Sequence, residues 1–160
     1  MTVETLAGAL EREHHEIDAG IEQFLASREQ GEAQPTPLSR ALSALRRHIY
    51  LEEEFVFPPL HDAGLMMPIY VMLREHREIW ETMDALDAQL ACRPAQRVSD
   101  ELCHDLLAQL ERHNSKEEAI IYPQADVELD PALDAQLRQF LADGDMPQGW
   151  RPAEQRTHHR

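Results

Sequence analysis

A motif that occurs twice constrains this chain more than any other feature of its sequence. The first copy, RHIYLEEEFVFP, covers residues 47–58, and the second, RHNSKEEAIIYP, covers residues 112–123. In each copy a Glu follows a His by four residues, and a second Glu, an apolar run, an aromatic residue and Pro come after it. Residues four apart lie on one face of a helix. The motif therefore predicts two pairs of side chains that point the same way: His48 with Glu52, and His113 with Glu117.

Apolar residues recur at three- and four-residue steps through most of the chain, and no segment alternates as a strand would. This periodicity predicts four long helices over residues 2–30, 37–58, 66–92 and 95 or 99–123, and a shorter one over 131–141. The second helix should stop at Pro58–Pro59 and the fourth at Pro123, because proline cannot donate the helix hydrogen bond. The pattern predicts an all-α protein, an antiparallel up-down-up-down four-helix bundle with a short extra C-terminal helix.

The chain is long enough for one domain with a sizeable core. We assign residues 1–142 to the bundle and its short fifth helix. Residues 143–160 are turn-rich and polar, so we expect a loose, flexible tail.

Charge and composition exclude several classes of partner. A net charge of −15 argues against a nucleic acid or an anionic membrane, since both need clustered Lys and Arg. No apolar run approaches the roughly 20 residues that span a bilayer, and the N-terminus lacks the basic start and apolar core of a signal peptide. Cys92 and Cys103 do not form a metal-spaced pair. We therefore expect a cytoplasmic protein with free thiols.

The duplication extends to the first and third predicted helices. Residues 12–17 read REHHEI and residues 74–79 read REHREI, so His14 aligns with His76. His15 aligns with an arginine. A helix turns by about 100° per residue, so two adjacent histidines cannot face one metal equally. The repeat favours His14 over His15, and the chain consists of two units that each pair a lone His with an H-x-x-x-E-E motif.

All four repeated histidines fall on the predicted apolar faces of their helices. An unpaired ionisable group there is costly, so each must be hydrogen-bonded or metal-bound. A single such His is more often a satisfied core residue than a ligand. Four of them, repeated in pairs with two glutamates on the same faces, favour a site for two metal ions. Imidazole with carboxylate suits Fe, Mn or Zn, and the absence of suitably placed Cys disfavours an iron–sulfur cluster.

At these residues the chain resembles the hemerythrin-like (HHE cation-binding) domains, over roughly residues 4–124. The resemblance rests on E-H in the first and third helices, and on H-x-x-x-E-E with an aromatic and Pro in the second and fourth. It implies a four-helix bundle that holds a non-haem di-iron centre with an oxo or hydroxo bridge and handles O2, NO, peroxide or iron. The resemblance implies that the oxygen-carrying members use five His, with the fifth His one turn after the ligand on the third helix. In this chain Trp80 stands at that position. The chain is more similar to the four-His, two-Glu type.

We predict that two Fe ions bind here, with Mn or Zn as substitutes. Two octahedral irons offer about twelve positions, of which the predicted ligands and one bridging oxygen fill all but roughly two. Open positions are typical of a reactive site. The predicted metal ligands, with the two glutamates as bridges, are His14, His48, Glu52, His76, His113 and Glu117.

Other polar residues are expected to play lesser roles. Asp18 stands one turn after His14, and we expect it at the bundle boundary near solvent. The alternatives are that it orients a ligand histidine or is itself an extra ligand. Four glutamates could hydrogen-bond groups behind the ligands, but bundle-edge positions are favoured for them: Glu13, Glu53, Glu75 and Glu118. We expect packing roles for Tyr50, Tyr70 and Tyr122. Four histidines lack repeated partners and are not expected to be ligands: His61, His104, His158 and His159.

The sequence predicts a di-iron protein that binds a small diatomic or peroxide ligand, in sensing or in oxidative or nitrosative stress defence, with a redox partner. Peroxide disproportionation or NO reduction at the same centre is the enzymatic alternative. An iron store or iron-sensing module without turnover is the non-catalytic alternative. A purely structural bundle would bind no metal and is the least favoured.

Overall fold

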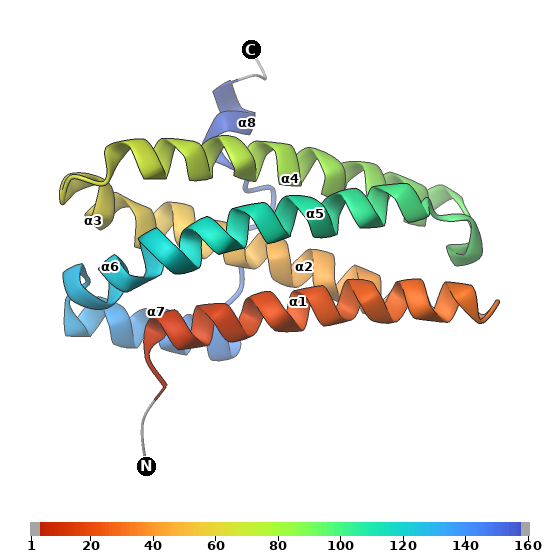
Figure 1. Ribbon diagram of the computed structural model, residues 1–160, viewed down its shortest axis with the longest axis horizontal. Helices are drawn as coiled ribbons and strands as arrows, with labels where there is room; N and C mark the ends of the chain where they lie inside the picture. Colours follow the sequence, from red (N-terminus) through yellow and green to blue (C-terminus); the bar gives the residue numbers. More distant parts are fainter. Residues whose placement is uncertain (1–3, 158–160) are drawn as a thin grey trace.

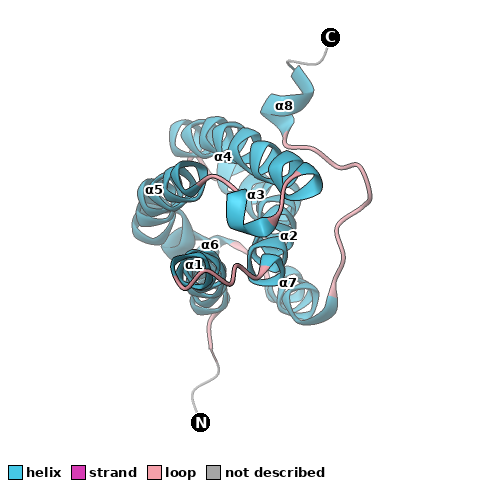
Figure 2. Cartoon of the chain, turned by 90° about the vertical axis from the view of Figure 1, so that its right-hand side faces the viewer, coloured by secondary structure: helices cyan, strands magenta, loops and turns pink. Residues whose placement is uncertain are grey.

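The computed structural model describes residues 4–157, and all regular structure in this part of the chain is helical. Four long helices run along the molecule (Figure 1), and the end-on view shows them surrounding a common centre (Figure 2). They are α1 (Leu6–Glu29), α2 (Pro35–Leu51), α4 (Met66–Cys92) and α5 (Asp100–Lys116). The predicted all-α four-helix bundle is confirmed. Among the described residues, no helix combines the length and apolar character that crossing a membrane requires.

Shorter helices extend the long ones and cover one end of the bundle. α3 and α6 continue the paths of α2 and α5, while α7 lies beside α1 (Figure 1). The short elements are η1 (Glu52–Val56), α3 (Phe57–Asp62), η2 (Ala95–Arg97), η3 (Glu117–Ile121), α6 (Tyr122–Glu128), α7 (Pro131–Asp143) and α8 (Ala153–Thr157).

Several helix ends follow from local chemistry. The side chains of Thr5, Ser99 and Asp130 accept hydrogen bonds from backbone N–H groups in the first turns of α1, α5 and α7, which is the usual N-cap arrangement. After α1 the chain turns at Gly31, whose φ of 77° suits a residue without a Cβ. The third predicted helix, residues 66–92, has the same bounds as α4.

The second and fourth helices do not end at their prolines as predicted. Each passes through one π-helical segment, η1 or η3, that begins at a predicted bridging glutamate. There the N–H of Phe57 donates to the carbonyl of Glu52, five residues back. Pro58 and Pro123 then lie in the first turn of the next helix, where no N–H is needed. Single π turns inside α-helices are frequent at functional sites.

Two apolar clusters fill the bundle on either side of a polar layer. One includes Ile17, Leu45, Ile79 and Leu110. The other includes Leu10, Leu51, Met72 and Ile121. Each long helix contributes to both clusters or continues into a helix that does, and its repeated histidine lies at or next to the change from one cluster to the other. The core therefore places four histidines in one layer, closed off above and below by aliphatic side chains.

Residues 144–157 cross from α7 to α4, where α8 lies against the bundle (Figure 2). Pro152 and Gln155 are buried, and the Trp150 ring lies 5.7 Å from that of Trp80. The Trp150 indole donates to Glu54 at 2.8 Å. The division of the chain at residue 142 and the flexibility of the segment after it stay predictions, and residues 1–3 and 158–160 lie outside the described residues.

The close approach of α1 and α2 depends on Gly20. A Cβ at this position would lie 3.0 Å from the Ala41 Cβ and 3.1 Å from the Pro37 carbonyl oxygen. Gly20→Val should therefore force the two helices apart and lower the free energy of unfolding by about 1–3 kcal/mol, measured by urea denaturation. Gly8→Ala, whose Cβ would lie 3.1 Å from the flexible Glu4 side chain, is the control and should stay within about 1 kcal/mol of the wild type. Equal stability of the two variants would contradict this packing.

Candidate metal centre

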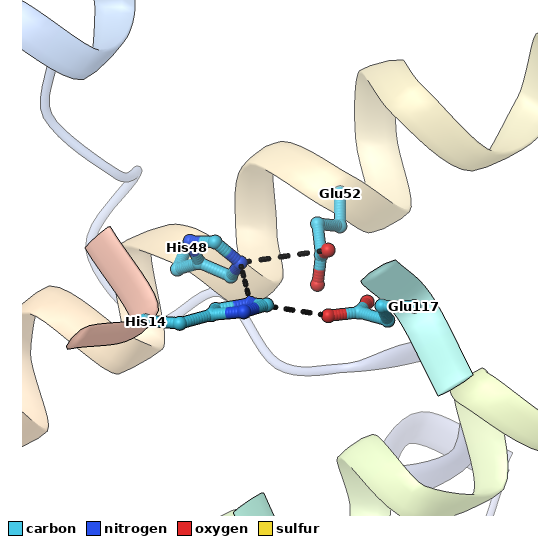
Figure 3. A group of neighbouring side chains, drawn as sticks. All are labelled: His14, His48, Glu52 and Glu117. Carbon is cyan, nitrogen blue, oxygen red and sulfur yellow. Dashed lines mark hydrogen bonds and ion pairs between the residues drawn. The ribbon is translucent and has the colours of Figure 1, made fainter. Parts of the chain in front are cut away.

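The six predicted ligands meet in one buried layer. His14 comes from α1, His76 from α4, and the two H-x-x-x-E pairs come from the α2–η1 and α5–η3 junctions. The four histidines are at most 3% exposed, and both glutamates are 0% exposed. Figure 3 shows the rings of His14 and His48 turned toward the carboxylates of Glu52 and Glu117. The predicted residues therefore come together, although metal binding by them stays a proposal.

These side chains form two overlapping clusters that share both glutamates. In each cluster, one potential ligand atom per residue lies within 4.8 Å of every other. The first cluster is His14, His48, Glu52 and Glu117, and the second is Glu52, His76, His113 and Glu117.

The two oxygens of each carboxylate face different clusters. Glu117 Oε1 lies 3.2 Å from His14 Nε2, and its Oε2 lies 3.2 Å from His113 Nε2. Glu52 Oε2 lies 3.5 Å from His48 Nε2, and its Oε1 lies 3.2 Å from His76 Nε2. A carboxylate that presents one oxygen to each of two sites is arranged to bridge two metal ions. The geometry fits a binuclear centre.

Three atoms of the second cluster are buried without a hydrogen-bond partner among the described residues: Glu52 Oε1, His76 Nε2 and Glu117 Oε2. His76 Nε2 and Glu52 Oε1 are close enough for an ion pair, but they are not aligned for a hydrogen bond. Buried polar atoms are rarely left unpaired, and a cation between them would satisfy all three. The nitrogen and oxygen donors therefore fit metals such as Fe, Mn or Zn.

Each histidine also contacts a carboxylate on the side away from the centre. The Nδ1 atoms of His14, His48, His76 and His113 lie 3.0, 2.8, 2.7 and 3.0 Å from Glu118, Glu13, Glu53 and Glu75, respectively. A ring whose Nδ1–H donates to a carboxylate presents the lone pair of Nε2 on the opposite side. Such partners fix the orientation of a metal-binding ring and raise its basicity.

These contacts favour the alternative expectation for the four glutamates, hydrogen bonds behind the ligands, over bundle-edge positions without a partner. Each follows or precedes a predicted ligand in sequence but contacts a ligand on a neighbouring helix. Glu13 precedes His14 yet contacts His48, and Glu53 follows Glu52 yet contacts His76. The internal repeat could have indicated these roles, because each unit has a Glu directly before its lone His and another directly after its bridging Glu.

Burial and charge act in opposite directions on the histidines. Burial lowers the pKa of His76, but its close contacts with the carboxylates of Glu52 and Glu53 outweigh burial and raise the pKa to about 10. The pKa of His48 is likewise raised against burial, chiefly by Glu52. Burial raises the pKa of Glu117, but the charge of His113 dominates and holds it well below the ordinary value. Protons on the histidines therefore neutralise part of the carboxylate charge that a metal cation would otherwise neutralise.

Tyr122 is a residue of the layer that the sequence did not reveal. Its hydroxyl oxygen lies within 3.1 Å of potential ligand atoms of His14, His48, Glu52 and Glu117. The expected packing role describes Tyr50 better, because its ring contacts Phe55, Phe140 and Trp150. Tyr70 is half-exposed on the surface.

The remaining candidates lie outside the layer. His15 is exposed, whereas Asp18 is partly buried and lines a cavity of about 350 Å³ with His14 and Glu118. Burial raises the pKa of Asp18. His61 lies near Tyr70 at the surface, His104 is exposed, and His158 and His159 lie outside the described residues. Trp80 is buried beneath the guanidinium of Arg46, at 4.5 Å.

A helical bundle with a duplicated His and Glu layer in its core defines a class of binuclear metal-binding proteins. The family model described as the hemerythrin HHE cation binding domain matches residues 5–125. The chain therefore belongs to the hemerythrin HHE cation-binding family. Comparisons with curated proteins and with solved structures gave no match.

Loss of a carboxylate behind a ligand should weaken metal binding without removing a ligand. Glu75→Ala removes the acceptor for His113 Nδ1, and we expect Fe²⁺ affinity to fall by about 10- to 100-fold. The measurement is anaerobic competition against a chelator of known affinity. Glu78→Ala, an exposed glutamate on the same helix, is the matched control and should bind like the wild type. Equal affinities of the two variants would count against the orienting role.

Metal binding should release protons from the cluster. His76, with a pKa of about 10, holds a proton at neutral pH in the metal-free protein, and only neutral imidazole is a metal ligand. Fe²⁺ affinity should therefore rise as the pH is raised from about 6 to about 8. Anaerobic calorimetry in two buffers of different ionisation enthalpy measures the release directly. Identical binding enthalpies in both buffers would contradict it.

Proposed function

We propose that the protein holds two iron ions between Glu52 and Glu117 and binds O2, NO or hydrogen peroxide there, in sensing or in oxidative or nitrosative stress defence. The observation that carries this proposal is the pair of buried clusters that share both carboxylates. The unpartnered atoms Glu52 Oε1, His76 Nε2 and Glu117 Oε2 support it. Imidazole and carboxylate donors suit iron, and an oxo or hydroxo group is the expected third bridge.

Iron in such a site supplies reversible one-electron redox change and exchangeable coordination positions. The protein's contribution is orientation and exclusion of water. Carboxylates hold all four rings by Nδ1, and the aliphatic clusters close the layer on both sides. The carboxylate partners also raise the basicity of the imidazoles, which favours the more highly charged ferric state.

Burial also limits what can reach the site. The histidines are at most 3% exposed and the bridging glutamates are 0% exposed, so a large organic substrate could not contact them without opening the bundle. Diatomic molecules and hydrogen peroxide are small enough to pass between packed side chains during ordinary fluctuations. This size limit supports a small inorganic ligand. A redox partner would have to exchange electrons through the protein, because the site is buried.

Anaerobic Fe²⁺ titration followed by exposure to O2, NO or hydrogen peroxide tests the proposal. The wild type should take up two irons per chain and develop an absorption spectrum that the added ligand changes. His113→Ala should lose iron from the second cluster and lose the spectral response. His104→Ala, an exposed histidine on the same helix, should behave like the wild type. No iron-dependent spectrum, or the same behaviour in both variants, would refute the proposal.

Hydrogen peroxide consumption and NO consumption by the iron-loaded protein distinguish an enzyme from a binding protein. Turnover that His113→Ala abolishes and His104→Ala retains would favour peroxide disproportionation or NO reduction. Ligand-induced spectral changes without turnover would favour sensing.

A second candidate function, iron sensing or storage without turnover, is favoured by one contact. Glu53 binds His76 Nδ1 with one oxygen and accepts the backbone N–H of Ala153, at the start of α8, with the other at 2.9 Å. Iron binding at His76 would therefore change the hydrogen bond between Glu53 and the backbone of the C-terminal segment. Slower amide hydrogen exchange at Ala153 on iron loading, with no peroxide turnover, would support this function. Unchanged exchange would exclude sensing through the C-terminal segment and leave only storage.

A further inference from the structure

Tyr122 occupies a special place in the first cluster. It is 0% exposed and begins α6, directly after the π-helical segment that carries Glu117. Its hydroxyl oxygen lies 2.9 Å from His14 Nε2, 3.1 Å from His48 Nε2, 2.8 Å from Glu52 Oε2 and 3.1 Å from Glu117 Oε1. One hydroxyl therefore faces all four members of the cluster.

These contacts cannot all be hydrogen bonds. A hydroxyl has one hydrogen to donate, and its four neighbours are acceptors when the Nδ1–H groups of His14 and His48 are donated to Glu118 and Glu13. The two Nε2 atoms lie only 3.1 Å apart, so their lone pairs also face each other. When both rings are neutral, as metal binding requires, five lone-pair-bearing atoms surround one proton, and a cation among them would attract every one.

The spacing of these atoms matches the coordination shell of such a cation. An octahedral ion with bonds of about 2.1 Å places adjacent donor atoms about 3.0 Å apart. The distance from His14 Nε2 to His48 Nε2 is 3.1 Å, that from His14 Nε2 to Glu117 Oε1 is 3.2 Å, and that from His48 Nε2 to Glu52 Oε2 is somewhat longer at 3.5 Å. The four distances from the Tyr122 oxygen fall between 2.8 and 3.1 Å. Tyr122 is thus spaced as a fifth donor, next to each of the other four.

The second cluster has no such donor at the corresponding position. In the repeat, Phe57 aligns with Tyr122. Phe57 stacks on His76 with ring centroids 5.5 Å apart, much as Tyr122 stacks on His14 at 5.4 Å. The two aromatic rings therefore occupy equivalent places in the two halves, and only one of them carries a hydroxyl.

We propose that Tyr122 is a ligand of the metal held by His14 and His48, and that the exogenous ligand binds the metal held by His76 and His113. In forming this bond the phenol O–H breaks, the oxygen binds the metal and the proton leaves to solvent. With the oxo or hydroxo bridge, the first metal then has six donors. The second has five, because Phe57 supplies none. This inference rests on the proposed binuclear iron site.

The first test is spectroscopic and needs no turnover. Phenolate bound to ferric iron gives a visible charge-transfer band with phenolate vibrations in resonance Raman spectra. The di-ferric wild type should show both, and Tyr122→Phe should lose both while it retains two irons per chain. Tyr70→Phe, which alters a half-exposed tyrosine, should retain both. Two bound irons with no phenolate signature in the wild type, or a signature that survives in Tyr122→Phe, would overturn the inference and leave the proposed function intact.

Azide binding to the di-ferric protein tests the position of the open site. The wild type should bind one azide per centre, and Tyr122→Phe should bind a second. Phe57→Tyr, which adds a hydroxyl on the other side, should lose azide binding while it retains both irons. Azide binding by Phe57→Tyr equal to that of the wild type would contradict the assignment. Absence of bound iron in the wild type would refute the proposed function as well.

Discussion

Two glutamates with no exposed surface face four imidazole nitrogens in the middle of this bundle, and the rest of the structure depends on that arrangement. Buried charges cost several kcal/mol each unless they are compensated. Here three interactions compensate the charges. Histidines lie beside the glutamates within the layer, carboxylates accept hydrogen bonds from the outer side of the rings, and a bound cation would add a third. The aliphatic clusters on both sides raise the cost of leaving the charges unpaired, and so strengthen the attraction for a metal.

The internal repeat explains how one chain builds two clusters that share both glutamates. Each half contributes a lone His, an H-x-x-x-E pair and a π turn, and each half supplies carboxylates that hold rings on a neighbouring helix. The halves differ in aromatic residues that contact the layer. Tyr122 and Phe57 occupy equivalent positions, yet one brings an oxygen to the centre and the other only a ring. A nearly symmetric scaffold therefore surrounds its two His and Glu clusters with different aromatic groups.

The sequence predicted the bundle and the six inward-facing side chains because both follow from helical spacing, which is local. It did not predict the continuation past Pro58 and Pro123, because a π turn replaces the bond to the fourth residue back with one to the fifth. Glu53 and Glu118 contact His76 and His14, which lie on other helices, so their partners could not be read from the spacing within one helix. The contacts of Glu13, Glu75 and the Tyr122 hydroxyl depend on neighbouring helices, which no local pattern specifies.

The most direct test of this account is a crystal structure of the iron-loaded protein with anomalous diffraction measured on both sides of the iron absorption edge. The account predicts two iron peaks per chain between Glu52 and Glu117, one beside His14 and His48 and the other beside His76 and His113. A single peak, or iron bound only at surface carboxylates while the layer holds none, would contradict it.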